Sequence, residues 1–151
     1  MREKIIVNAS KKIFYDYTVK EKYECGIVLL PWEVKAIRNS GCSIMNSYVS
    51  IRHLELWLVG LHINIPFFLN SSNNLKSDRD RKLLLHKKEL MYFLGILKMK
   101  GCTLVPSKVY WKKNFIKIEV CLGVGKKKYD KRISIKTREW NLDKQRMLKN
   151  V

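Results

Sequence analysis

Residues 115–124 read FIKIEVCLGV, and this stretch decides the fold class. Its apolar side chains occupy every second position: Ile116, Ile118, Val120, Leu122 and Val124. Because successive residues of a β-strand point to opposite faces, a period of two predicts a strand with one buried face. The preceding stretch TLVPSKVYW, residues 103–111, is expected to pair with it through a turn at residues 112–114.

Further segments extend this strand pattern toward the N-terminus. Residues 47–63 predict two antiparallel strands with a break at residues 52–55. Residues 13–30 are rich in Ile, Val, Tyr and Phe, and they predict one long or bent strand. Within these strands Gly26 indicates a bulge or a close backbone approach, and Pro106 indicates an edge or bulged position.

Two segments carry the signals of helices. Pro31 suits the first position of a helix that ends at Gly41. Residues 82–100 predict a longer helix with Gly101 as its cap. The apolar stripe of this longer helix consists of Leu83, Leu90, Phe93, Leu94 and Leu97. The stretch before it, residues 64–81, is rich in Ser, Asn and Asp and predicts a long surface loop.

Together these segments predict a mainly β protein with five or six antiparallel strands and two or three flanking helices. In a chain of 151 residues such strands are expected to close into a small barrel. We expect three regions along the chain. Residues 1–12 form a flexible N-terminal arm, residues 13–124 form the barrel, and residues 125–151 form a basic C-terminal tail.

The chain is strongly basic, with 31 Lys and Arg residues against 13 acidic ones and a net charge of +18. A charge of this size opposes compaction unless a counter-charge is present, and nucleic acid is the usual partner. An anionic membrane surface is the less favoured alternative. No apolar run approaches the roughly 18 residues of a membrane span, and residues 5–7 are too short for the core of a signal peptide. We therefore expect a cytoplasmic protein.

The sequence offers no pattern for catalysis, a metal ion or a cofactor. The four cysteines lack CxxC spacing, so we expect reduced thiols, and the three histidines lack metal-ligand spacing. Residues 123–126 read GVGK, but a phosphate-binding loop needs a glycine at Val120 and Ser or Thr at Lys127. A nuclease would need paired carboxylates or a histidine dyad. We therefore predict a protein that is not an enzyme.

The tail combines charge with aromatic residues. Residues 125–151 hold ten Lys and Arg residues and three acids, which is +7 of the total charge. Such a segment cannot bury enough surface to order itself alone. Lys and Arg bind phosphates, while the rings of Tyr129 and Trp140 can stack on unpaired bases. We expect the tail to be disordered in the free protein and to become helical on a polyanionic partner.

Seven short motifs follow each other along the chain. They are Tyr23-Glu24-Cys25-Gly26-Ile27, Trp32-Glu33-Val34-Lys35, Ser47-Tyr48-Val49, Arg81-Lys82-Leu83-Leu84-Leu85-His86, Tyr110-Trp111-Lys112, Gly125-Lys126-Lys127 and Asp130-Lys131-Arg132. In this order they resemble the motifs of the SmpB family, the small proteins that bind bacterial transfer-messenger RNA (tmRNA). The resemblance covers residues 10–150 and implies an oligonucleotide-binding-like (OB-like) barrel.

The resemblance implies that the barrel holds the tRNA-like domain of tmRNA. The RNA-contacting positions that it assigns are Glu24, Leu84, His86 and Lys117. In these roles a carboxylate accepts from base or sugar groups, an apolar side chain or an imidazole packs on bases, and an ammonium group binds phosphate. Charge alone adds five weaker candidates, which are Lys35, Arg38, Arg79, Arg81 and Lys82.

The resemblance also implies that the tail enters the decoding centre and the empty mRNA channel of a stalled 70S ribosome and becomes helical there against ribosomal RNA. The tail residues that it assigns to this contact are Gly125, Lys126, Lys127, Asp130, Lys131 and Arg132. Tyr129 stands where a base-stacking ring is expected, and Trp140, Met147 and Leu148 stand where the tail packs against the channel.

The implied function is ribosome rescue by trans-translation, with elongation factor Tu as a further partner through the tmRNA complex. The alternative is a general single-stranded nucleic-acid-binding protein on the same barrel. The two differ in their ligand, because the first demands a folded tRNA-like RNA and the second prefers an unstructured strand.

Overall fold

The two long strands predicted from the alternating pattern pair with each other, as expected. In the computed structural model, which describes residues 4–69, 75–98 and 101–149, strand β8 (Cys102–Lys112) pairs antiparallel with strand β9 (Phe115–Gly125). Lys113 adopts a positive φ of 55° in the turn between them. The alternation is confirmed over residues 115–119, where Ile116 and Ile118 are buried while Phe115 and Lys117 lie on the other face. From Val120 to Gly123 every residue is buried, so the prediction of one buried face is wrong there, and Cys121 packs in a second small cluster.

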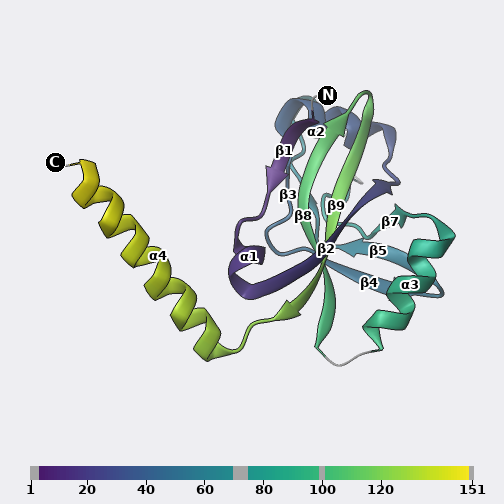
Figure 1. Ribbon diagram of the computed structural model, residues 1–151. Coiled ribbons are helices and arrows are strands. Elements are labelled where there is room, and N and C mark those ends of the chain that lie inside the picture. Colours follow the sequence, from purple (N-terminus) through teal and green to yellow (C-terminus); the bar gives the residue numbers. More distant parts are fainter. Residues whose placement is uncertain (1–3, 70–74, 99–100, 150–151) are drawn as a thin grey trace.

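Five further strands join this hairpin in one antiparallel sheet (Figure 1). They are β1 (Lys4–Ala9), β2 (Tyr17–Ile27), β4 (Tyr48–Arg52), β5 (Glu55–Val59) and β7 (Arg81–Leu84). The order across the sheet is β1-β8-β9-β2-β7-β5-β4, and β4 also contacts β8. The sheet therefore curls into a barrel-like form. A separate two-stranded sheet consists of β3 (Cys42–Ser43) and β6 (His62–Ile63).

Irregular pairing curves the long strands. The register shifts between Val19 and Glu21 in β2 and between Pro106 and Lys108 in β8. Bulges of this kind increase the local twist and bend of a strand. The prediction of a bulged position at Pro106 is confirmed. At Gly26 the predicted close approach is confirmed, since a Cβ atom there would lie 3.2 Å from the Leu84 Cβ atom.

The structure has four α-helices and a short 3₁₀ helix within the described residues. They are α1 (Lys12–Asp16), α2 (Pro31–Ser40), α3 (Lys87–Leu97), α4 (Lys128–Lys149) and η1 (Phe67–Leu69). Helix α2 begins and ends as predicted, with Pro31 in its first turn and Gly41, at φ +74°, as its C-cap. The hairpin of β4 and β5 also forms as predicted, and its turn residues His53 and Leu54 have positive φ.

The N-terminal segment differs from the sequence prediction. Instead of a loosely held arm, residues Lys4–Ala9 form β1, which pairs with β8 from Lys4↔Lys112 to Ala9↔Lys108. Instead of the start of a strand, residues Lys12–Asp16 form α1. Residues 1–3 of the predicted arm lie outside the described residues. Pairing with a distant strand, which local pattern does not reveal, satisfies the backbone groups of this segment.

The segment predicted as one helix over residues 82–100 is divided. Residues Arg81–Leu84 form β7, which lies between β2 and β5 and pairs with both, and α3 begins only at Lys87. Leu83 is therefore in the barrel core and does not extend the stripe of the helix. Tertiary pairing overrides the helical propensity of the Leu run. Residues 99 and 100 of the predicted helix lie outside the described residues.

A buried ionic cluster joins α2 to β7. Glu33 and Arg81 are both fully buried, and the Arg81 Nε and Nη2 atoms lie 3.0 and 2.9 Å from Glu33 Oε1. Arg79 donates from Nη2 to Glu33 Oε2 at 2.6 Å. Burial alone would raise the pKa of Glu33, but hydrogen bonds from Arg79, the Leu30 backbone and Arg81 lower the pKa.

We expect the Glu33→Gln variant to lose about 3–5 kcal/mol of unfolding free energy, because a buried guanidinium would lose its counter-charge. The matched control is Asp80→Asn in the exposed Arg52–Asp80 pair, 2.6 Å apart, where the cost should stay below about 1 kcal/mol. Urea unfolding followed by circular dichroism measures both. Equal losses in the two variants would contradict a special role for the buried cluster.

Candidate nucleic-acid interface

One hollow on the barrel gathers the residues that the family resemblance assigned to RNA. It lies where β2, β7 and β9 meet the N-terminus of α3, elements that are labelled in Figure 1. Its lining residues are Glu24, Gly26, Leu84, Leu85, His86, Glu89 and Lys117. The sheet register explains the gathering, because Gly26 pairs with Leu84 on one side and with Lys117 on the other.

Gly26 lets the side chains of the hollow approach each other. A Cβ atom at this position would lie 3.2 Å from the Leu84 Cβ atom and 3.7 Å from the Lys117 ammonium nitrogen. Leu84 is 51% exposed although it belongs to a strand in the middle of the sheet. An apolar side chain and an ammonium group therefore stand side by side at the surface, which suits a base with its phosphate.

Glu24 is held as an oriented anion at the edge of the hollow. Its Oε2 atom accepts a hydrogen bond from the Tyr110 hydroxyl at 2.6 Å, and its Oε1 atom accepts one from Lys112 at 2.6 Å. The Lys4 ammonium nitrogen lies 3.5 Å away. The bonds from Lys112 and Tyr110 lower the pKa of Glu24 to about 2. The carboxylate is thus ionised at neutral pH, so it accepts hydrogen bonds and cannot donate them.

Helix α3 is fixed over β2 by a small aromatic cluster. The Tyr92 hydroxyl donates to Glu21 Oε1 at 2.9 Å, and the Tyr23 hydroxyl donates to the other oxygen of the same carboxylate. The Tyr23 ring meets the buried Phe93 ring edge-on at 4.6 Å. At the N-terminus of α3, the His86 backbone donates to Glu89 Oε2 at 3.1 Å, so the exposed His86 side chain begins a capped helix.

The five candidates from charge alone do not line the hollow. Arg81 is fully buried against Glu33, so the prediction that its guanidinium contacts RNA is wrong. Arg79 binds the same carboxylate and keeps 27% of its side chain exposed, while Lys82 pairs with Glu55. The other two, Lys35 and Arg38, lie exposed on α2. The Arg38 guanidinium stacks over the Trp111 ring at 5.2 Å.

Sequence reasoning missed three residues around Glu24. Tyr110 and Lys112 follow each other at a strand spacing of two, and Lys4 pairs directly with Lys112. The spacing of Tyr110 and Lys112 was a usable signal, because both lie on the face that carries Lys117 across the hairpin. Lys4 gave no such signal, because the sequence did not predict β1.

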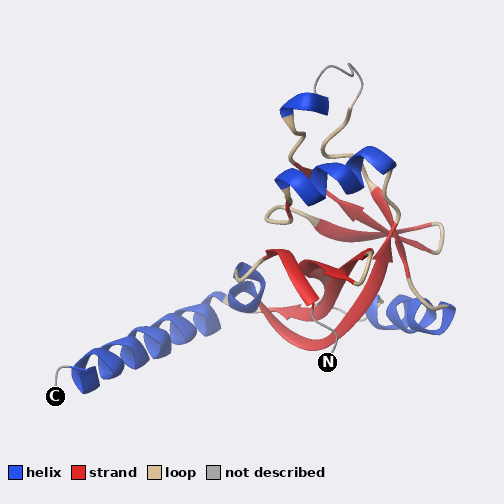
Figure 2. Ribbon diagram, turned by 90° about the horizontal axis from the view of Figure 1, so that it is seen from above, coloured by secondary structure: helices blue, strands red, loops and turns tan. Residues whose placement is uncertain are grey.

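The tail leaves the barrel on the side away from α3 (Figures 1 and 2). The backbone N–H of Lys126 donates to the Asp16 carbonyl at 2.9 Å, and the ammonium group of Lys126 donates to the Phe14 carbonyl at 3.0 Å. Lys131 binds the Asp16 carboxylate at 2.8 Å, and this hydrogen bond raises the pKa of Lys131. Helix α4 has no buried residue over Lys128–Lys149, and Trp140 is 72% exposed.

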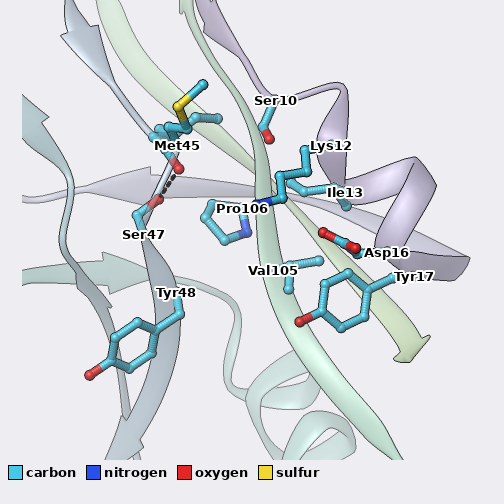
Figure 3. Close-up of a pocket in the computed structure, with 11 residues that line it drawn as sticks. Ser10, Lys12, Ile13, Asp16, Tyr17, Met45, Ser47, Tyr48, Val105 and Pro106 are labelled. Atoms are coloured by element: carbon cyan, nitrogen blue, oxygen red, sulfur yellow. Dashed lines mark hydrogen bonds between the residues drawn. The ribbon is translucent and has the colours of Figure 1, made fainter. Parts of the chain in front are cut away.

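A second hollow is lined in part by Asp16, the residue that binds Lys131 of the tail (Figure 3). It lies between α1 and the segment that leads from β3 into β4, and its lining includes Asp16, Tyr17 and Tyr48. Ser47, also in its wall, donates to the Ile44 carbonyl at 2.7 Å. The candidate RNA residues lie elsewhere, so this hollow is distinct from the one at Glu24.

The described residues hold no cluster of three His, Cys, Asp or Glu side chains that could bind a metal ion. All four cysteines have free thiols, and those of Cys25, Cys42 and Cys121 are buried. Across residues 4–69, 75–98 and 101–149, none of the helices has the length and apolar character of a membrane span.

The fold and the hollow define a basic barrel protein with a candidate nucleic-acid interface. The chain belongs to the SmpB family, whose model, described as SmpB protein, matches residues 7–150. The SsrA-binding protein of Nitrosospira multiformis is 46% identical over 142 residues, covering 93% of this chain and 95% of the relative. That of Coxiella burnetii (strain Dugway 5J108-111) is 42% identical over 144 residues, covering 93% and 89%.

A solved structure described by the words "tmRNA-SmpB: a journey to the center of the bacterial ribosome" contains a similar chain. It is 39% identical to this one, with a TM-score of 0.58, and the match covers 76% of this chain and 80% of that chain. The mainly β, OB-like fold expected from the sequence is thereby confirmed.

We expect the Glu24 carboxyl to titrate at about pH 2, and the Lys112→Met variant to raise its pKa toward the ordinary 4.5. Because the folded pKa is the lower one, Glu24 stabilises the fold above pH 4.5, and this contribution is lost as the pH falls toward 2. NMR titration of the side-chain carboxyl carbon measures the shift. Lys113→Met is the control, and an unchanged Glu24 pKa in Lys112→Met would refute the contact.

Proposed function

We propose that this protein binds the tRNA-like domain of tmRNA and delivers it to stalled ribosomes for trans-translation. Membership of the SmpB family and relatives named SsrA-binding protein support this role. The single observation that carries it is the hollow, which brings Glu24, Leu84, His86 and Lys117 together from β2, β7, the α3 N-terminus and β9. These four are the positions that the family pattern assigns to the RNA.

The chemistry of the hollow is recognition and not catalysis. The Glu24 carboxylate accepts hydrogen bonds from base or ribose donors, and Lys117 binds a phosphate oxygen. Leu84 and His86 pack against exposed bases. Watson–Crick and sugar edges of unpaired bases are accessible mainly in the loops of a folded RNA, so the site suits the elbow of a tRNA-like domain. Peptidyl transfer then belongs to the ribosome.

The tail acts on the ribosome in this proposal. Since α4 buries no side chain against the barrel, its tertiary support within the described residues is the contact of Lys131 with Asp16 and Tyr15 on α1. Ribosomal RNA in the decoding centre and the empty mRNA channel supplies the missing counter-charge and contacts. Tyr129, 73% exposed, stacks on a base, and the exposed apolar side chains at Trp140, Met147 and Leu148 pack against the channel. Helix α4 thus obtains its packing contacts beyond α1 from its partner.

The remaining partners follow from the same cycle. Elongation factor Tu joins the complex through tmRNA, and the cytoplasm is the site of action. The protein needs no cofactor for these steps, because every one of them is a binding event.

Removal of residues 128–151 should leave binding of the tRNA-like domain unchanged and abolish tagging of stalled peptides. The cut follows the last strand, because β9 ends at Gly125, and it keeps Lys126, which binds α1. Gel-shift affinity and peptide tagging on ribosomes stalled at the end of a truncated mRNA measure the two activities. Loss of both together would contradict a tail that works mainly on the ribosome.

A comparison of folded and unstructured RNA separates the proposed function from that of a general single-stranded nucleic-acid binder. We expect Lys117→Glu to weaken binding of the folded tRNA-like domain about tenfold or more, the effect of losing one charged hydrogen bond, while unstructured RNA of equal length changes little. Both are measured at the same salt concentration, because phosphate contacts weaken with salt for any partner. Equal losses for the two RNAs would favour the general binder.

A further inference from the structure

Phe115 is an aromatic side chain exposed at the tip of the β8–β9 hairpin. It is 68% exposed, while its neighbours Ile116 and Ile118 on the same strand are buried. A large exposed ring at the start of a central strand adds nothing to the core. Because strand residues two apart share a face, Phe115 lies on the face of Lys117, which lines the RNA hollow.

The surface between Phe115 and the hollow is continuous. Phe115 pairs across the hairpin with Lys112, whose ammonium group binds Glu24 at 2.6 Å. Lys117 pairs with Tyr110, whose hydroxyl binds the other oxygen of the same carboxylate. Neighbouring side chains of two strands thus connect the exposed ring to Glu24 without an intervening element.

Basic side chains surround the ring on this surface. Lys113 is exposed in the turn that precedes it, and Lys112 keeps 40% of its side chain exposed. Lys4 of the edge strand β1 pairs with Lys112 and is 50% exposed. An exposed ring among ammonium groups is the arrangement that binds an unpaired base together with its flanking phosphates. The ammonium groups also favour an anionic polymer over an apolar protein partner.

We propose that Phe115 is a stacking platform for an unpaired base of the same RNA, next to the nucleotides held in the hollow, with Lys113 on an adjacent phosphate. The identity of the RNA rests on the proposed function. The contact extends the interface from β2 and β7 across β9 to the hairpin tip. It accounts for a phenylalanine exposed where strand alternation calls for a polar side chain.

The chain offers a matched control for this ring. Phe67 is 93% exposed and lies on η1, beyond α2 in Figure 2 and away from α3. Replacing either phenylalanine by alanine should leave the urea midpoint unchanged, because neither ring is buried. Any difference in RNA binding between Phe115→Ala and Phe67→Ala then reports contact with the ligand.

We expect Phe115→Ala to weaken binding of the tRNA-like domain about 5- to 150-fold, the range of one lost base–aromatic stack, and Phe67→Ala to bind as wild type. Phe115→Trp should retain affinity, and Phe115→Leu should lose it although it keeps the apolar surface. Filter binding at fixed salt measures all four. Wild-type affinity in Phe115→Ala or Phe115→Leu would overturn the proposal.

The salt dependence separates the ring from its neighbouring charge. Phe115→Ala should leave the slope of log affinity against log salt unchanged, while Lys113→Ala should reduce it by about one phosphate contact. A reduced slope in Phe115→Ala would overturn stacking as its role. If wild type fails to bind the tRNA-like domain, the proposed function itself fails; if wild type binds and Phe115→Ala binds equally, only the stacking platform fails.

Discussion

The buried ion cluster of Glu33, Arg81 and Arg79 is the constraint on which the rest of the structure depends. Arg81 begins β7, and besides Glu33 it binds the Leu61 carbonyl at 2.7 Å and the Ser77 carbonyl at 2.9 Å. A four-residue strand in the middle of the sheet is thereby tied to α2 and to the loop before it. Because β7 carries Leu84 into the candidate RNA hollow, the fully buried Glu33–Arg81 pair sets the position of an exposed residue.

The long strands divide their two faces between folding and binding. On β9 the side chains of Ile116 and Ile118 fill the barrel, while Lys117 between them points to the candidate interface. Apolar burial thus stabilises the same backbone that positions the charges. The carboxylate of Glu24 partly offsets the local positive charge, and Tyr110 and Lys112 hold it in one orientation. Rigid strands of this kind position binding groups more precisely than loops do.

The barrel and the tail are joined at one place, the short helix α1. The Asp16 carbonyl accepts a hydrogen bond from the Lys126 backbone, and the Asp16 carboxylate binds the Lys131 ammonium group. The first turn of α4 therefore starts from a fixed point beside α1. Since β2 and β9 run side by side to Tyr17 and Gly125, the tail exits next to α1 and on the side away from α3. One RNA on the barrel and another along the tail can therefore be engaged together, as the proposed cycle requires.

The sequence by itself determined the β8–β9 hairpin, α2 and the β4–β5 hairpin, because alternation, Pro31 and turn residues act over a few neighbouring positions. It also determined the basic character of the tail, and its motifs pointed to the residues of the hollow. Only the tertiary structure decided that residues 81–84 form a strand and that residues 4–9 join the sheet. It also decided that Arg81 is buried while Lys112 holds Glu24. The physical reason is that local patterns specify which side chains need burial or a counter-charge. They do not specify which distant strand buries a side chain or which distant residue supplies the counter-charge.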